Sequence, residues 1–301
     1  MRAVLLRPAV LLRPAEQGHR RVGTTAVVVV GEGLIGAAVT RRLRRRPVLA
    51  ERHVPIRWDQ PEFAESTRYL LHETGATSVE VVWSAGAFGM GSLLEVDRLA
   101  TQFADNIDAV ISCASDLAPV RMHLVSSAGA LGCPSGDRRF ETVDSPYKAV
   151  KAAEEDIVRS LDIPAQIHRV TSVFGSRSHT GRAGLVGVLL ANALRRQETA
   201  LFARTTTMRN YIHADDVGET LVRAVLGTST ETTLIAAKRS HAMNEVVATA
   251  QQILRRPIPV SYRPPKNHHD MVFSPRVVSP LVPERSLSAG MRLVNDALAS
   301  A

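Results

Sequence analysis

Cysteine is scarce in this sequence, whose 301 residues include two, Cys113 and Cys133. Their spacing fits neither a disulfide framework nor the closely placed thiols of a zinc site. The cluster His268-His269-Asp270 has no partner spaced to complete a metal site either. We therefore expect a protein of a reducing compartment, the cytoplasm, that holds no metal.

Long apolar runs and aromatic residues are also few. No run approaches the roughly 20 apolar residues of a transmembrane helix, so we expect a soluble chain with no membrane partner. Aromatic residues make up 4% of the chain, too few to suggest base-stacking platforms. The net charge of +8 allows an anionic partner. Because many arginines are scattered over helix faces, we expect a small molecule and no nucleic acid.

Residues 1–25 contain a short duplication, in which Leu5-Leu6-Arg7-Pro8-Ala9 is followed by Leu11-Leu12-Arg13-Pro14-Ala15. Arginine and proline interrupt both apolar runs. A signal peptide needs an unbroken apolar stretch of about 7–15 residues, so this segment does not match one. We predict an N-terminal extension.

A glycine-rich run, Gly31-Glu32-Gly33-Leu34-Ile35-Gly36, follows the apolar residues 26–30 directly. The pattern predicts a buried strand, a tight turn and a helix whose N-terminus binds the pyrophosphate of a dinucleotide. Gly31 permits the turn, Gly33 lets the backbone approach the pyrophosphate, and Gly36 lets the helix pack closely on the strand. A glycine turn packed for purely structural reasons is the alternative.

The strand predicted within residues 48–58 should end beside the ribose of the adenosine. An acid at that point binds the 2′-hydroxyl of NAD, whereas an arginine accepts the 2′-phosphate of NADP. Arg57 and Asp59 both lie near it, and both can equally be solvated loop charges. The sequence therefore leaves NAD and NADP open.

Two further predicted strands end in small polar residues. One leads into Ser84-Ala85-Gly86 and the other into Ser126-Ser127-Ala128-Gly129. Ligands of doubly wound folds bind at the carboxyl ends of the strands, so both segments are expected to face the cofactor or the substrate. Asn106 lies in a helix predicted from about residue 93 to 114, and we expect its amide to tie two loops together.

Tyr147 and Lys151 are four positions apart in a predicted helix and so share one face. An ammonium beside a phenol favours the phenolate, and the Ser127 hydroxyl could hold a substrate oxygen next to it. This is acid–base chemistry on an alcohol or carbonyl, the kind that accompanies hydride transfer with a nicotinamide. Tyr-x-x-x-Lys alone is usually a surface pair, but after a dinucleotide turn and a Ser-Ser strand end it is far more specific.

Four motifs in this order resemble an extended short-chain dehydrogenase/reductase of the NAD-dependent epimerase/dehydratase family. They are the glycine turn, residues 126–132, Tyr147 with Lys151, and residues 209–217. Residues 106–109 and 169–175 are weaker matches. The resemblance implies an α/β fold with a Rossmann-type doubly wound parallel sheet and a small C-terminal α/β substrate lobe, in a homodimer. The expected divisions are residues 1–25, 26–180 and 181–301, with elements of the last returning to the core.

The resemblance also implies roles for individual residues. Tyr147 would be the general acid/base, Lys151 would hold the nicotinamide ribose and tune Tyr147, and Ser127 would bind the reacting oxygen. Thr171 and Arg209 would bind the substrate, Arg209 through a diphosphate. The expected cofactor-binding residues are Gly31, Gly33, Leu34, Ile35, Gly36, Arg57, Asp59, Ser84, Ala85, Gly86, Asn106, Ser126, Tyr147, Lys151, Val170 and Ser172.

The chain departs from the family pattern in several places. Val30 stands where a first glycine is usual, Leu131 replaces a tyrosine, Ser172 an asparagine and Asn210 an aspartate. These changes concern the identity of the substrate more than the fold. Where the 4,6-dehydratase branch has Thr-Asp-Glu this chain has Ser127-Ala128-Gly129, so elimination of water is not expected.

Two classes of function follow. One is an NAD(P)-dependent ketoreductase or epimerase acting on a nucleotide sugar or a similar glycosylated metabolite. The other is a non-catalytic NAD(P)-binding regulator, because a fold does not determine a function. Ser127, Tyr147 and Lys151 favour the enzyme. Reductase and epimerase differ in the fate of the cofactor rather than in protein groups, so the sequence leaves both open.

Overall fold

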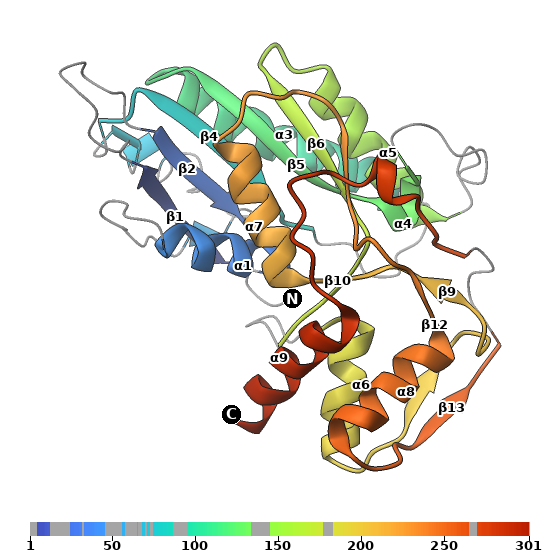
Figure 1. Cartoon of the computed structure of the whole chain (residues 1–301). Coiled ribbons are helices and arrows are strands. Elements are labelled where there is room, and N and C mark those ends of the chain that lie inside the picture. The colour runs from blue at the N-terminus through green and yellow to red at the C-terminus, as the bar shows by residue number, and fades with distance from the viewer. Residues whose placement is uncertain are drawn as a thin grey trace.

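The computed structural model describes residues 5–12, 25–31, 33–45, 56–57, 65, 68–69, 71–72, 75–86, 95–133, 145–176, 183–264 and 270–300. Asp59, His268 and His269 therefore lie outside the described residues. Figure 1 shows a sheet flanked by helices and, beyond one end of it, a smaller group of helices and short strands near the C-terminus.

The centre of the larger part is a seven-stranded sheet in the order β11-β6-β5-β4-β2-β1-β3. All of its pairings are parallel except those of β1 with β2 and with β3. The strands are β1 (Leu5–Leu12), β2 (Thr25–Val30), β3 (Ile56–Arg57), β4 (Ser78–Trp83), β5 (Val120–Ser127), β6 (Ala165–Val170) and β11 (Thr233–Ile235).

Helices cover both faces of this sheet (Figure 1). Alternate side chains of β2 enter two different cores, because successive side chains of a strand point to opposite faces. Val28 packs in the same core as Phe103, and Val29 in the same core as Val39. The helices are α1 (Leu34–Arg44) and α7 (Ala214–Val225) on one face, and α3 (Val96–Ser115) and α5 (Pro146–Arg159) on the other. The doubly wound α/β fold predicted from the sequence is confirmed.

Strand β1 comes from the residues for which the sequence predicts an N-terminal extension. It pairs antiparallel with β2 and so satisfies backbone groups along one edge of that strand. The described part of the strand predicted within residues 48–58 is β3, which pairs with β1 rather than with β2. Arg57, the last residue of β3, thus lies two strand spacings, about 10 Å, from the line of β2.

The smaller part has its own hydrophobic core. Leu190, Val246 and Met291 are buried in it, each contributed by a different helix. Its elements are α6 (Gly184–Leu194), β8 (Thr199–Leu201), β9 (Met208–Arg209), β12 (His241–Ala242), α8 (Met243–Leu254), β13 (Val260–Tyr262) and α9 (Leu287–Ala299). The remaining elements are β7 (Ser172–Phe174), β10 (Tyr211–His213), the short α4 (Ala128–Leu131) and the 3-10 turn at Pro275–Val277. The chain crosses between the two parts several times, since β10 pairs with β7 and β11 pairs with β6.

One helix expectation needs correction. The sequence predicts a helix over residues 61–78 that buries Phe63, Tyr69, Leu70 and Leu71, of which Phe63 and Leu70 lie outside the described residues. Leu71 is buried, but 60% of Tyr69 is exposed. Residues two apart on a helix point roughly 200° from each other, so one core cannot hold both. Gly75 has φ +59°, a left-handed conformation, and β4 begins at Ser78, so the helix does not reach residue 78.

None of the helices in the described residues is long and apolar enough to cross a membrane.

Candidate active site

The glycine turn packs tightly against the end of β4. Gly31 has φ +105°, a conformation that favours glycine, and a Cβ there would lie 2.5 Å from the backbone nitrogen of Ala85. A Cβ on Gly36 would lie 1.8 Å from the carbonyl oxygen of Gly31. The Ser84 hydroxyl donates to the carbonyl oxygen of Val30 at 3.0 Å, which ties the ends of β2 and β4 together. Gly31, Gly36 and Ser84 therefore shape the turn itself.

Gly33 differs from the other two glycines. A Cβ added there would meet no atom of the described residues within 4 Å. Gly33 is also the N-cap of α1, and no side chain in the described chain caps that helix. Leu34, Ile35 and Gly36 open the helix, so their N–H groups have no intrahelical acceptor. An uncapped helix N-terminus beside open space suits a pyrophosphate, so the residues present fit a dinucleotide.

The carboxyl end of β5 carries the two serines that the sequence singles out. Ser126 is buried and its hydroxyl donates to Glu155 Oε1 at 2.6 Å. Ser127 is also buried, and its Oγ accepts from the backbone nitrogen of Ala130 at 3.2 Å, which caps α4. This contact fixes the Ser127 oxygen in place. The Ser127 proton can then be donated to a ligand oxygen.

Helix α5 presents Tyr147 and Lys151 one turn apart. Ser145 caps the helix, and Pro146 at its first position favours helical geometry. The Tyr147 side chain is 39% exposed, whereas Lys151 is buried. The Lys151 Nζ donates to Glu154 Oε2 at 2.6 Å. The spacing of these residues predicts one shared helix face, and Lys151 lies near enough to Tyr147 for their charges to interact.

Two glutamates that follow Lys151 have different surroundings. Burial alone would raise the pKa of Glu155, but hydrogen bonds from Arg169 and Ser126 lower it below its usual value. Burial raises the pKa of Glu154, and the ammonium of Lys151 opposes that shift only in part. No motif in the sequence predicts a role for either glutamate, although two carboxylates one turn after a candidate catalytic lysine are visible there.

Arg169 and Glu155 hold three elements of the site together. The Nε and Nη2 of Arg169 donate to the two oxygens of Glu155, each at 2.9 Å, and its Nη1 donates to the carbonyl oxygen of Leu131 at 2.9 Å. Ser126 binds the same carboxylate. This cluster joins the end of β5, helix α5 and strand β6, and so fixes the position of Tyr147 relative to Ser127.

Thr171, expected to bind substrate, has a partner within the protein. It is buried, and its hydroxyl donates to Asn210 Oδ1 at 2.9 Å. The Asn210 amide in turn donates to the carbonyl oxygen of Ala237 at 2.8 Å. Val170 is buried at the end of β6, and Ser172 pairs with Tyr211 between β7 and β10. Thr171 and Asn210 thus join strands at the border of the two parts.

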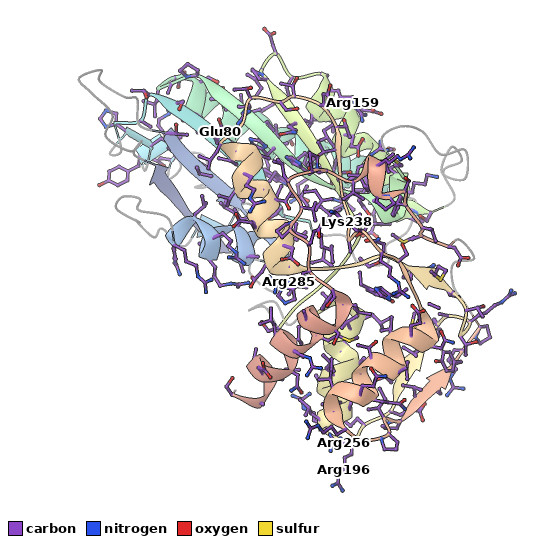
Figure 2. The ribbon with its side chains drawn as sticks, viewed as in Figure 1. Glu80, Arg159, Arg196, Lys238, Arg256 and Arg285 are labelled. Carbon is purple, nitrogen blue, oxygen red and sulfur yellow. The ribbon has the colours of Figure 1, made fainter. Side chains whose placement is uncertain are left out.

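Arg209 lies on β9, at the border between the two parts. Its Nη1 donates to the carbonyl oxygen of Met208 at 2.9 Å. From the sequence, a structural pair of Arg209 with Asp215 or Asp216 is the alternative to substrate binding. The structure does not support that pair, because Asp215 binds Arg41 and Asp216 binds Arg285, each at 2.8 Å. Figure 2 shows Arg285 where the two parts meet.

Met271 connects β9 to the Ser127 turn and was missed by the sequence analysis. Its backbone nitrogen donates to the carbonyl oxygen of Met208 at 3.0 Å, and Asp270 Oδ1 accepts from the backbone nitrogen of Met208 at 2.9 Å. A Cβ added at Gly129 would lie 3.6 Å from both Met271 Cε and Ser127 Oγ. This chain of contacts places β9, which carries Arg209, near the turn that follows β5 at Ser127. No sequence motif indicates Met271.

The remaining expected residues lie less directly in the site. The Asn106 amide donates to the carbonyl oxygen of Gln102 in its own helix at 2.7 Å, and among the described residues this is the contact that its side chain makes. Ala85 is buried, and Gly86 is exposed at the end of β4. Within the described residues no group of three His, Cys, Asp or Glu side chains is placed to hold a metal ion. Arg196 and Arg256 lie at the end of the smaller part away from the sheet (Figure 2).

A doubly wound sheet with a glycine turn at an uncapped helix N-terminus defines a dinucleotide-binding α/β protein. The sequence matches the profile of the NAD dependent epimerase/dehydratase family over residues 27–233. The chain belongs to this family, as the motifs of the sequence predicted. A comparison with curated proteins found no match.

Several solved structures share the fold. UDP-glucose 4-epimerase of Thermotoga maritima, with UDP-glucose, is 18% identical with a TM-score of 0.68, over 91% of this chain and 98% of that one. The Thermus thermophilus UDP-glucose 4-epimerase complex with NAD is 21% identical with a TM-score of 0.69, over 91% and 99%. TunA, an NAD-dependent NDP-hexosamine 5,6-dehydratase of tunicamycin biosynthesis, is 17% identical with a TM-score of 0.67, over 91% and 97%.

Proposed function

We propose that this protein is an NAD-dependent oxidoreductase that interconverts an alcohol and a ketone on a nucleotide sugar, as an epimerase or a ketoreductase. The observation that carries the proposal is the half-exposed Tyr147 phenol one turn before the buried Lys151 ammonium, on a helix fixed to the Ser127 strand end. These groups supply acid–base chemistry at the edge of the sheet where the glycine turn would hold a dinucleotide.

Each residue has a distinct task in this proposal. Gly33 leaves room for the pyrophosphate at the N-terminus of α1, and Lys151 donates to the ribose next to the nicotinamide. Ser127 donates a hydrogen bond to the reacting oxygen of the sugar. Tyr147 takes the proton of that hydroxyl when the carbon is oxidised and returns it when the carbonyl is reduced. NAD, when bound, supplies the hydride acceptor for this chemistry.

Arg209 is proposed to bind the diphosphate of the substrate. A guanidinium can pair with a phosphate through two parallel charge-assisted hydrogen bonds. The contacts of Met208 with Asp270 and Met271 hold β9 against the segment that touches the Ser127 turn. The sugar attached to such a diphosphate would extend toward Ser127 and Tyr147.

The choice between epimerase and ketoreductase rests on the cofactor. An epimerase keeps its NAD and returns the hydride to the same sugar, whereas a ketoreductase exchanges the nucleotide in each turnover. The solved UDP-glucose 4-epimerases with the same fold support epimerisation. NAD is the cofactor of the family.

The test is to analyse the nucleotide released from the purified, denatured protein by mass and absorbance, and then to supply UDP-glucose with NAD and follow UDP-galactose. Retained NAD with conversion of the sugar supports the epimerase. An empty site with consumption of reduced nucleotide on a keto sugar supports the ketoreductase. Retained NAD with no turnover of any keto or hydroxy sugar would instead identify a non-catalytic regulator.

A further inference from the structure

Glu154 forms an ion pair with Lys151 in the candidate site but has no role in the proposed function. Nζ and Oε2 are 2.6 Å apart, and both residues are buried. Both belong to α5, three positions apart, so the pair forms within one helix face and does not join two elements. A contact within one helix face adds little to the fold, so its geometry suggests a task at Lys151 itself.

We propose that Glu154 is the positioning residue of Lys151, whose carboxylate holds the ammonium charged and oriented toward the ribose site. The inference rests on the proposed function, in which Lys151 binds the ribose. An ammonium removed from water is unfavourable unless a negative group compensates it. Ribose hydroxyls are neutral and cannot supply that compensation. Glu154 can, because its carboxylate already contacts the nitrogen.

The neighbouring charges support this assignment. Burial is the largest single influence on the pKa of Lys151 and lowers it, but the charge and hydrogen bond of Glu154, together with the charges of Tyr147 and Glu155, raise that pKa above its usual value. Tyr147 and Glu155, on the same helix, act in the same direction with smaller effect. Glu155 is already engaged by Ser126 of β5 and by Arg169 of β6. Glu154 is thus the carboxylate committed to Lys151.

Glu154→Gln keeps the shape and an acceptor oxygen but removes the charge. The Lys151 pKa should then fall, so that the amine loses its proton as the pH rises. Its donated hydrogen bond would weaken, because bonds from charged donors are stronger than those from neutral ones. A purely structural role for Glu154 would instead give a loss that does not depend on pH.

The experiment measures NADH affinity by fluorescence titration between about pH 7 and about pH 9. For Glu154→Gln we expect the Kd to rise about fivefold more than in the wild type across this range, equivalent to about 1 kcal/mol. Glu154→Asp keeps the charge, so its Kd for NADH should change with pH no more than that of the wild type. The matched control is Asp156→Asn, which removes an exposed ion pair with Arg159 from the same helix. Its Kd for NADH should likewise follow that of the wild type across the pH range.

A second comparison holds even if Glu154→Gln does not fold. Lys151→Met and Lys151→Met/Glu154→Leu should bind NADH equally, because Glu154 acts through Lys151. Two results would overturn the inference about Glu154 and leave the proposed function standing. One is a Kd for NADH that differs by more than about fivefold between these two variants, and the other is a Kd of Glu154→Gln that changes with pH as the wild-type Kd does. Failure of the wild-type chain to bind NADH at any pH would overturn the proposed function and the inference with it.

Discussion

Titratable side chains gather in two regions: in the middle of the sheet, on strands β4, β5 and β6, and at its carboxyl edge, where helix α5 carries Tyr147 and Lys151. In the middle, His123 lies between Glu80 and His168, with nitrogen–oxygen and nitrogen–nitrogen distances of 2.9 and 3.1 Å. Arg121 donates to Glu80 at 2.8 Å, and His168 contacts Thr233 at 2.9 Å. Figure 2 shows Glu80 beside the end of α7.

The titratable groups at the carboxyl edge differ from those in the middle in their exposure to solvent. Both histidines of the middle cluster are almost fully buried, and their ring nitrogens contact protein groups. At the edge, Tyr147 is half-exposed, and among the described residues nothing lies within 4 Å of a Cβ added at Gly33 and no side chain caps α1. A cluster of titratable residues is therefore not a site by itself. The carboxyl edge of the sheet differs from the middle cluster because it has room for a ligand and carries groups that can contact one.

The largest effect should follow from Tyr147→Phe. The phenol proton is needed in the transition state and not for cofactor binding, so turnover should fall by about 10²–10⁴-fold with NADH affinity nearly unchanged. Initial rates with UDP-glucose and a parallel NADH titration measure both quantities. Wild-type rates in this variant would show that Tyr147 takes no part in the chemistry, and the edge would then have no catalytic group to distinguish it from the middle cluster.

Gly33→Val tests the open space at the edge. The added side chain should occupy the position of the pyrophosphate and lower NADH affinity by at least about tenfold. Because a Cβ at Gly33 meets no atom of the described residues within 4 Å, the melting temperature should hardly change. Gly36→Ala is the matched control, since its Cβ would clash with backbone, and it should destabilise the fold by about 1–3 kcal/mol. Unchanged affinity in Gly33→Val would argue against the site.

Arg209→Ala should act on the substrate rather than on the cofactor. Loss of two charge-assisted hydrogen bonds to a diphosphate should raise KM for UDP-glucose by at least about tenfold and leave the KM for a free sugar unaltered. Melting temperature measured on the same protein controls for a structural role. An equal loss for both substrates would exclude the diphosphate contact.

The smallest effect concerns the buried histidines. Burial lowers the pKa of His123, and burial together with the charges of His123 and Arg121 lowers that of His168 well below its usual value. Below about pH 6.5 the unfolded chain binds protons that the folded chain excludes, so stability should decrease as the pH falls. Melting temperatures at about pH 7.5 and pH 5 measure this loss. His168→Gln should lose less melting temperature between these two pH values than the wild type does. An identical loss in that variant would show that the buried histidine does not cause the pH dependence.

The sequence predicts those features that depend on local pattern. The valine-rich β2, the glycine turn and the four-residue spacing of Tyr147 and Lys151 are local, and each led to a correct element or helix face. The insertion of β1 beside β2 depends on pairing between residues far apart, which no local pattern specifies. The same holds for Met271, which reaches the Ser127 turn from the far end of the chain. Asn106 shows that a polar helix residue can satisfy part of its amide within its own helix, which its position in the sequence does not reveal.

The most direct test of the edge as an active site is a single-turnover measurement. NAD-loaded wild-type protein is mixed with UDP-glucose, and the absorbance of reduced NAD is followed beside that of Tyr147→Phe. We expect a transient rise in the wild type and none in the variant, because Tyr147 must take the proton of the sugar hydroxyl for the oxidation to occur. Equal traces for the two proteins, or no rise in the wild type with any nucleotide sugar, would contradict the assignment.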